Sequence, residues 1–550
     1  MTPVIQIKTT DIIIFSVALY IIRILIRGRQ KGYTTPLTGP PSKSLIFGLS
    51  RYLNSIDDPG KVMEDWAAEH GSVYKIPTVF GGTKVVICDP RAIRDFYSKE
   101  TFTYVGTPLA KTFIAKVFGR GLLWAEGESH KRQRKALTPA FSNAAIRRLT
   151  SVFYDSSYKL KTHWDTELLN HPKGLVMDVQ NWMNHISLDS IGIAGFSHDF
   201  GSLDGKSSAV VEAFESLGST KPSAFGTIIF LLSFVFPFLN NLPTKRQRML
   251  MALKKSMRDI ADVLLERTRK SGAEDKSIIG LLIKAESANG ELHMTEEEVL
   301  AQNVLLLAGY ETTSISLTWA LIELAKQPEK QTRLRKELLE GAGGTDPTWD
   351  RLMGPEFPYL DAVVHEILRM HPPLSETNRV ATENDILPLS VPFTTADGKV
   401  VDSIAVAKGT TVAAPIRCVN RAEAVWGPRA KEFIPERWLG FSEDEKEKGD
   451  VRVEWQAKEK IWGEDGIPPT VREIQGHKHL LTFSDGPRTC LGKGFALAEF
   501  KAALSVLIRN YQFSFDDPDV KIGLQRAILP RPKVEGCDGA KVPMRVRRVE

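Results

Sequence analysis

Cysteine is scarce in this 550-residue chain, which contains four of them. They stand far apart and form no CxxC pair: Cys88, Cys418, Cys490 and Cys537. This spacing excludes a disulfide-rich scaffold and argues against a structural zinc site, because both need closely spaced cysteines. We therefore expect the body of the protein to lie in a reducing compartment.

An excess of charge of one sign is also missing. The 72 basic and 66 acidic residues leave a net charge of +6, and no long block of like charge occurs. This pattern predicts that the protein binds no nucleic acid. Internal repeats and low-complexity linkers are absent too, so the chain, with 42% hydrophobic residues, is expected to fold as one large domain.

Long hydrophobic runs are few, and the first lies near the N-terminus, from Ile12 to Ile26. It contains Arg23 and is followed by basic residues, which predicts a membrane anchor at residues 1–32 with a cytosolic exit. The run is shorter than the ~20 residues that usually span a bilayer, so a cleaved signal peptide is the alternative. Pro36 and the prolines after it prevent helix continuation. We expect a hinge there, followed by a single domain at residues 33–550.

Helical patterns dominate the middle of the chain. The segment from Thr295 to Pro328 opens with Thr295 and Glu298 in capping-box spacing and predicts one long helix of about eight turns. Apolar residues surround this helix, so it is expected to run through the core. Short β-rich pieces, bounded by glycine or proline, occur at residues 72–90 and 409–416. The predicted fold class is mainly α with small β-sheets.

Within this long helix lies AGYETTS, residues 308–314, whose chemistry is unusual for a buried segment. Gly309 costs about 1 kcal/mol relative to alanine in a helix interior, and threonine hydroxyls can bond back to carbonyls one turn earlier. Glu311 and Thr312 could together pass protons to a ligand beside this turn. The alternative is structural: a glycine for close helix packing and a glutamate in an ion pair.

A second motif follows in a helix that is stopped by Pro372. Glu366 and Arg369 are three residues apart, so they lie on one face and can form a charge-assisted pair. Further on, the segment FIPERW at residues 433–438 supplies Arg437. An isolated ExxR is usually a solvated face, so its meaning depends on the motifs around it.

The third motif is FSDGPRTCLG, residues 483–492. With the preceding motifs in the same order, it resembles the cytochrome P450 family of haem-thiolate monooxygenases, over essentially the whole chain after the N-terminal segment. The haem-binding pattern of that family, FxxGxRxCxG, is matched at every fixed position: Phe483, Gly486, Arg488, Cys490 and Gly492. The chemistry agrees, because a thiolate ligand favours O–O cleavage, glycines let the main chain approach the sulfur, and an arginine can meet a haem propionate.

The resemblance implies a cytochrome P450 fold in which the long central helix lies over haem b. Cys490 would be the axial ligand of the haem iron, and Glu311 and Thr312 would assist proton delivery. A buried ion-pair network would brace the cysteine loop, with three members: Glu366, Arg369 and Arg437.

The segment GESHKRQRKALTPAF, residues 127–141, resembles the helix that crosses the haem edge in this family. Arg134 would meet a propionate there, and His130, a further cofactor-binding candidate, stands where many members have tryptophan. Two other departures are Arg429, where an acidic residue is usual, and the long charged stretch at residues 441–466. We expect both of these to be surface features; the alternative is that their charge shapes the docking of a redox partner.

The chain has no Walker loop and no flavin or nicotinamide fingerprint. Electrons would therefore come from another protein, most simply an NADPH-cytochrome P450 reductase on the same membrane. The similarity to microsomal members implies the endoplasmic reticulum membrane, with a single N-terminal anchor and a cytosolic catalytic domain.

Bulky apolar residues predict an apolar small-molecule substrate: Phe113, Phe118, Leu305 and the run from Ala224 to Asn240. That run is interrupted by Pro237 and is expected either to dip into the membrane interface or to form a buried helix. The similarity to fungal microsomal members that tailor secondary metabolites favours a terpenoid. A fatty-acid hydroxylase is the nearest alternative. A haem-thiolate isomerase or peroxygenase would need no reductase, and a non-catalytic haem-binding protein would also keep the cysteine loop.

Overall fold

The structure is a computed structural model of the whole chain. It describes residues 32–206, 294–439, 469–525 and 529–549, with scattered positions between 248 and 280. Three predictions fall outside the described residues: the N-terminal anchor, the apolar run at 224–240 and the charged stretch at 441–466.

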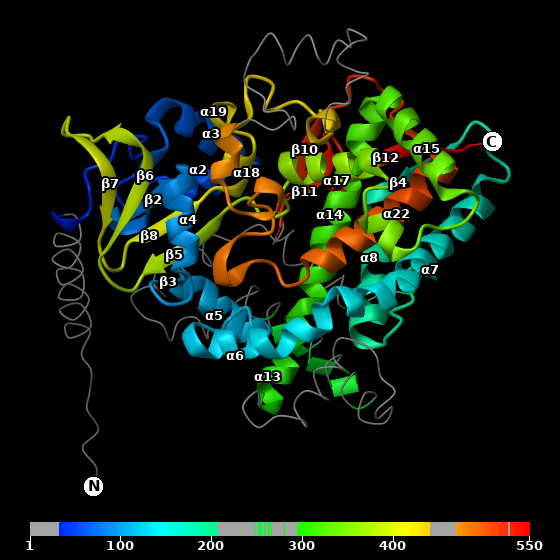
Figure 1. Cartoon of the computed structure of the whole chain (residues 1–550), viewed down its shortest axis with the longest axis horizontal. Coiled ribbons are helices and arrows are strands. Elements are labelled where there is room, and N and C mark those ends of the chain that lie inside the picture. Colours follow the sequence, from blue (N-terminus) through cyan, green and yellow to red (C-terminus); the bar gives the residue numbers. More distant parts are fainter. Residues whose placement is uncertain are drawn as a thin grey trace.

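Helices dominate the described chain and pack around α14, Val304–Lys326. α8 lies along α14, and α17 and α22 also contact it (Figure 1). The other α-helices are α2 Ser50–Leu53, α3 Pro59–His70, α4 Pro90–Ser98, α5 Pro108–Val117, α6 Gly127–Leu137, α7 Asn143–Leu168, α8 Val179–Phe196, α13 Glu296–Leu300, α15 Pro328–Ala342, α16 Trp349–Met353, α17 Pro358–Met370, α18 Ile416–Asn420, α19 Glu423–Trp426 and α22 Lys493–Asn510.

The strands form small sheets, and the largest has the order β1-β2-β8-β5-β3. In it β2 and β8 pair in parallel, whereas the other neighbours are antiparallel. Figure 1 shows this sheet at one end of the molecule, beside the helical body. The strands are β1 Val73–Pro77, β2 Thr83–Ile87, β3 Tyr104–Gly106, β4 Leu175–Asp178, β5 Thr377–Ala381, β6 Asp385–Thr394, β7 Val400–Val406, β8 Thr411–Ala414, β9 Tyr511–Ser514, β10 Ile522–Gln525, β11 Arg531–Val534 and β12 Pro543–Arg548.

The predicted fold class, mainly α with small β-sheets, is confirmed. The β-rich pieces predicted at residues 72–90 and 409–416 contain β1, β2 and β8, which belong to one sheet. The predicted capping box is present as well. Thr295 Oγ1 accepts from the Glu298 N–H at 3.2 Å, and Glu298 Oε2 accepts from the Thr295 N–H at 3.0 Å.

The predicted long helix is present from Glu297 to Lys326, and a 3₁₀ turn at Ala301–Asn303 within it separates α13 from α14. The side chain of Gln302 donates to the carbonyl of Glu298 at 2.9 Å, and its Oε1 accepts from the Leu122 N–H at 3.3 Å. This side chain thus competes for a carbonyl that the α-helical ladder would use, which is a known cause of local helix distortion.

Hydrophobic residues surround α14, and most of the helix is buried. Among the described residues, Glu297–Lys326 is the one helical stretch with the length and apolar character of a membrane span, and most of it lies inside the protein. As predicted, this helix runs through the core.

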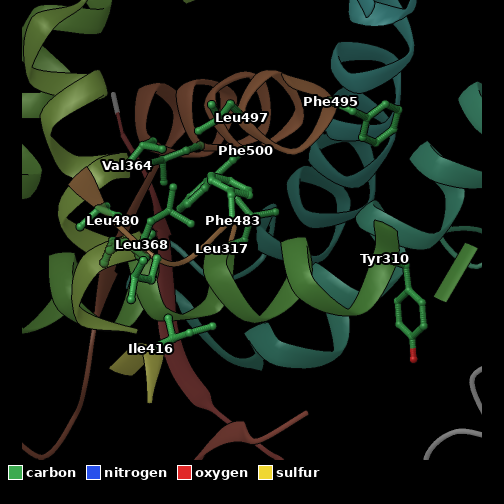
Figure 2. Packing of buried hydrophobic residues seen from close by; sticks show 14 of the residues in the cluster. Tyr310, Leu317, Val364, Leu368, Ile416, Leu480, Phe483, Phe495, Leu497 and Phe500 are labelled. Atoms are coloured by element: carbon green, nitrogen blue, oxygen red, sulfur yellow. The ribbon is translucent and has the colours of Figure 1, made fainter. Parts of the chain in front are cut away.

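Phe483 lies in this core, next to the C-terminal half of α14 (Figure 2). Around it are Leu317 of α14, Val364 and Leu368 of α17, and Phe500 of α22. Burial of this ring fixes the start of the segment that leads to the cysteine loop.

A buried ion-pair network joins α17 to the 3₁₀ turn at Pro435–Trp438. Glu366 and Arg369 form a bidentate pair in which both N–O distances are 2.8 Å. Arg437 Nε donates to Glu366 Oε1 at 3.2 Å. The side chains of all three residues are at most 1% exposed.

Further donors complete the surroundings of the Glu366 carboxylate. Trp438 Nε1 donates to Oε2 at 3.0 Å, and the Ile434 N–H donates to Oε1 at 2.9 Å. Burial by itself raises the pKa of Glu366, but Arg369, Arg437 and the hydrogen bonds outweigh it and lower this pKa to about 2. The carboxylate is therefore ionised at any physiological pH.

The network reaches the cysteine segment through Asn420. Arg369 Nη1 donates to the carbonyl of Asn420 at 2.9 Å. The amide side chain of Asn420 in turn accepts from the Leu481 N–H at 3.1 Å and donates to Thr482 Oγ1 at 2.8 Å. Since Thr482 directly precedes Phe483, one charged cluster sets the position at which the cysteine segment begins.

Replacing Glu366 with glutamine should destabilise the fold by ~3–5 kcal/mol, because it leaves Arg369 and Arg437 buried without a counter-charge. The free energy of unfolding, measured with urea, checks this prediction. The matched control is Glu432→Gln, which removes the partner of Arg429 in an exposed ion pair and should cost at most ~1 kcal/mol. Equal effects of the two substitutions would contradict the prediction.

Candidate functional site

The segment from Phe483 to Gly492 turns sharply before α22. Gly486 has a φ of +63°, and a Cβ there would lie 2.3 Å from the carbonyl oxygen of Tyr97, so both the conformation and the space require glycine. The Cys490 N–H donates to the Phe483 carbonyl at 2.7 Å and closes the turn. Cys490 is thereby placed just before Gly492, the N-cap of α22.

The surroundings of the Cys490 thiol have opposing effects on its pKa. Burial raises the pKa of Cys490, whereas the Gly492 N–H and the charges of Arg134 and Lys493 lower it. The residue is nevertheless accessible to solvent. A metal bound at this thiol would complete the deprotonation that the cations and the helix N-terminus favour.

One strip of α14 is accessible although the helix lies in the core. Ala308 is exposed, and Leu305, Gly309 and Thr312 are partly exposed. Their spacing of three and four residues places them on one helix face. Gly309 also permits close packing, because a Cβ there would lie 2.7 Å from Ile191 of α8. The glycine therefore has the packing role that we named as the structural alternative.

The two residues predicted to move protons have different surroundings. Thr312 belongs to the accessible strip, and its Oγ1 donates to the Ala308 carbonyl at 2.7 Å. Glu311 is 1% exposed, and its Oε1 accepts from Arg531 Nε at 3.2 Å. Burial raises the pKa of Glu311, against the lowering effect of Arg531. Glu311 thus takes part in an ion pair, while Thr312 faces accessible space.

Basic side chains gather around His130 of α6. The imidazole is 3% exposed. Burial, together with the charges of Arg488, Arg134 and Arg379, lowers the pKa of His130 to about 3. At neutral pH the imidazole is uncharged, so the positive charge of this cluster resides on the three arginines.

Two carboxylates face the same cluster. Glu126 pairs with Arg488, and its Oε1 accepts from the Gly106 N–H at 2.7 Å. Glu100 lies 2.9 Å from Nε of Arg379. Burial raises the pKa of Glu100 to about 7 despite this arginine. At neutral pH the cluster therefore carries more positive than negative charge.

This set of residues fits a haem. The accessible Cys490 offers a thiolate for the iron, and the surplus of arginines suits two propionates. Nε of Arg488 is buried and has no hydrogen-bond partner among the described residues, so a donor remains for an anionic group. The predicted Arg134, His130, Arg488 and Cys490 are brought together in one region.

Three residues of this region were not predicted. Arg379 lies on β5, Asn420 ends α18 and Arg531 begins β11. Each is distant in sequence from the residue that it contacts. For Arg379 and Arg531, the local sequence shows only a charged residue inside a short β-rich segment. This pattern does not identify the residue that the arginine contacts.

A family model described as Cytochrome P450 matches residues 38–535 of the chain. Two relatives from Ampulloclitocybe clavipes, "Cytochrome P450 monooxygenase claP" and "Cytochrome P450 monooxygenase claQ", are 62% and 61% identical, over 100% of this chain and of each relative. "Cytochrome P450 monooxygenase 205" from Postia placenta is 33% identical, over 94% of this chain and 93% of the relative.

These matches confirm the resemblance that the motifs indicated. The chain belongs to the cytochrome P450 family, whose members are haem-containing monooxygenases that use dioxygen.

Proposed function

We propose that the protein oxidises an apolar small molecule, with a terpenoid as the favoured class, using O2 and electrons from NADPH-cytochrome P450 reductase. The observation that carries this proposal is the accessible Cys490 thiol, which lies just before α22 and beside basic groups. Haem b, when bound, would supply the dioxygen chemistry, with Cys490 as the ligand of its iron.

The residues around Cys490 have separate roles in this proposal. The loop residues Phe483 and Gly486 give the cysteine its position, the first by burial and the second by its tight turn. Arg134 and Arg488 would bind the haem propionates, and neutral His130 lies near both arginines. Arg379 on β5 adds a third cation to this set.

The network of Glu366, Arg369 and Arg437 braces the cysteine segment. Its hydrogen bonds run from α17 through Asn420 to the residues before Phe483. Because the carboxylate is saturated with donors, the segment is held in one place when charge changes at the thiolate.

Thr312 and Glu311 move protons in this proposal. Thr312 Oγ1 lies on the accessible strip of α14 and can both donate and accept a hydrogen bond. Burial raises the pKa of Glu311, which brings the carboxyl closer to the pH at which proton transfer is efficient. The two residues are consecutive in α14, so their side chains leave the helix about 100° apart, and the proposed transfer runs from the carboxyl to the hydroxyl.

An apolar substrate is supported by the side chains near the N-terminal half of α14. Phe113 and Phe118 meet edge to face with ring centroids 6.5 Å apart. Both belong to the same hydrophobic cluster as Leu305, which lies on the accessible strip. Aromatic and aliphatic groups of this kind bind a terpenoid through burial of its apolar surface.

The sequence supports two further parts of the proposal, a separate reductase and a membrane anchor. The chain has no nucleotide-binding fingerprint of its own, so NADPH acts through a separate reductase. The apolar run at residues 12–26 supports an N-terminal anchor at residues 1–32 in the endoplasmic reticulum membrane, with the catalytic domain in the cytosol.

Replacing Cys490 with serine should abolish the red-shifted absorption that thiolate ligation gives to the ferrous, carbon-monoxide-bound protein. Product formation should be lost with it. The spectrum is measured on membranes from a host that expresses the full chain. The control is Cys537→Ser, which changes a cysteine outside the site and should leave the band intact.

The same host, supplied with a reductase and a set of terpenes, tests the reaction itself by metabolite profiling. Oxidised terpenes that require both Cys490 and the reductase support the proposal. Product formed with peroxide and without reductase would indicate a peroxygenase, and products confined to fatty acids would indicate the alternative hydroxylase. Either result would overturn the corresponding part of the proposal.

Thr312→Ala should leave the carbon-monoxide band intact and uncouple NADPH consumption from product. Loss of the proton relay should slow the proton-transfer step by ~10²–10⁴. The ratio of product to NADPH consumed is the measurement, and Thr318→Ala, on the buried side of the same helix, is the control. Wild-type coupling in the Thr312 variant would show that this threonine has only a structural role.

Deletion of residues 1–32 should release the chain from membranes and preserve the carbon-monoxide band, because the predicted site residues all lie downstream. Turnover of a membrane-dissolved substrate with a membrane-bound reductase should fall. Fractionation and spectra of the truncated chain provide the test. Loss of the band would show that this segment is part of the fold rather than a tether.

A further inference from the structure

Two cysteines that are distant in the sequence lie in contact in the fold. Cys88 directly follows β2, and Cys418 belongs to α18. The two residues are 330 positions apart, and their sulfur atoms are 3.9 Å apart. All four cysteines of the chain lie in its described part and are free thiols. The fold thus creates a thiol pair that the spacing of the cysteines in the sequence did not indicate.

Hydrogen bonds and packing hold the backbone on both sides of this pair. The Cys88 N–H donates to the Ser72 carbonyl at 2.7 Å. α18 packs against α3 (Figure 1), and the Cys418 sulfur lies 4.0 Å from the carbonyl oxygen of Met63 on that helix. Met63 and Tyr74 belong to a hydrophobic cluster against which Cys88 packs. The tertiary structure therefore keeps the two sulfurs together.

A cavity of about 280 Å³ lies beside Cys418 and includes this residue in its lining. Asn54, an exposed residue, lines the same cavity, so the space reaches the protein surface. A water molecule takes about 30 Å³ in the liquid, and hydrogen peroxide is little larger. A small oxidant therefore has room to reach Cys418, and the Cys418 side chain has room to move.

The chemistry of the pair suits oxidation better than metal binding. Among the described residues, no cluster of three His, Cys, Asp or Glu side chains could hold a metal ion, whereas structural zinc takes four ligands. The hydrogen bond with Cys418, together with burial, raises the pKa of Cys88. Cys88 is therefore protonated at neutral pH. The thiol that an oxidant in the cavity meets first is Cys418.

We propose that Cys88 and Cys418 are a modification site at which hydrogen peroxide forms a reversible disulfide that ties α18 to the end of β2. Hydrogen peroxide is the two-electron reduction product of dioxygen, which members of this family use. The inference goes beyond the proposed function and does not depend on the identity of the substrate.

The oxidation takes place in two steps. The Cys418 thiolate attacks hydrogen peroxide, so the O–O bond breaks, an S–O bond forms and hydroxide leaves. The Cys88 sulfur then attacks the Cys418 sulfur and displaces the second hydroxide, which forms the S–S bond. Two electrons pass from sulfur to oxygen, and both thiol protons end in two molecules of water. A dithiol reductant reverses the reaction by thiol–disulfide exchange.

The disulfide fastens a helix that positions the cysteine segment. Asn420 lies two residues after Cys418 on α18, and its side chain accepts from the Leu481 N–H. An S–S bond is ~2.05 Å long, so the sulfurs have to approach by roughly 2 Å, for which the cavity provides space. A link between positions so far apart in the sequence restricts the unfolded chain. The oxidised protein should therefore resist unfolding more than the reduced protein.

The first measurement identifies the bond in the purified full chain. After treatment with hydrogen peroxide, free thiols are blocked in acid and the protein is digested with trypsin, which releases residues 85–91 and 418–421. Mass spectrometry should find these two peptides joined in monomeric protein, with free thiol lost from both cysteines at the same rate. Dithiothreitol should restore both thiols. The control Cys537→Ala, which removes a cysteine outside the pair, should give the same yield.

The variant Cys88→Ala tests the first step. Its Cys418 sulfenic acid has no neighbouring thiol, so dimedone, which traps sulfenic acids, should label Cys418. Absence of this label, while the wild type cross-links, would place the first attack on Cys88 and overturn the assigned order.

The urea midpoint, followed by tryptophan fluorescence, tests the consequence for stability. Peroxide should raise the midpoint of the wild type and should not raise it in Cys88→Ala or Cys418→Ala. Equal midpoints of the oxidised and reduced wild type would show that the bond does not fasten α18.

The wild type alone can refute the inference, so the folding of the variants does not limit the test. Cys537 serves as an internal reference for the oxidant, because it is a partly exposed free thiol. If peroxide oxidises Cys537 but leaves Cys88 and Cys418 as thiols, or joins them only between chains, the inference is wrong. These readouts involve no substrate turnover, so their failure is distinct from failure of the proposed function.

Discussion

The buried carboxylate of Glu366 is the constraint on which the rest of the site depends. An ionised group in the interior is tolerated only when its charge and its lone pairs are met, and each partner then has one permitted position. Here the partners come from α17 and the 3₁₀ turn at 435–438. Through Asn420 the same cluster fixes the chain just before Phe483. A charge pair within one helix thereby determines where a distant cysteine lies.

The charged groups at the site itself are less completely paired than the Glu366 carboxylate. Around His130 the arginines outnumber the ionised carboxylates, and at Glu311 burial raises the pKa of the carboxyl despite Arg531 and the Leu529 N–H. These groups are incompletely compensated within the protein. Saturated ion pairs brace the structure, and unsaturated ones are available to a cofactor or a proton.

The features that could be predicted are those whose residues lie close together in the sequence. The cysteine loop, the Glu366–Arg369 pair and the capping box at Thr295 each lie within a few residues, so their geometry follows from the sequence. Arg379, Asn420 and Arg531 converge on their partners only through the tertiary fold. At the 3₁₀ turn in the long helix, Gln302 likewise accepts from the N–H of Leu122, which is distant in sequence. The membrane anchor stays a prediction, because its residues lie outside those described.

The parallel pairing of β2 with β8 has a consequence for biosynthesis. Lys84 of β2 stands opposite Thr411 of β8 in this sheet, so the first strand emerges from the ribosome long before its partner. Until then β2 presents an open edge to other chains. Contacts of such large sequence separation form slowly and leave nascent protein exposed to aggregation. The completed sheet can exist only after most of the polypeptide has been made.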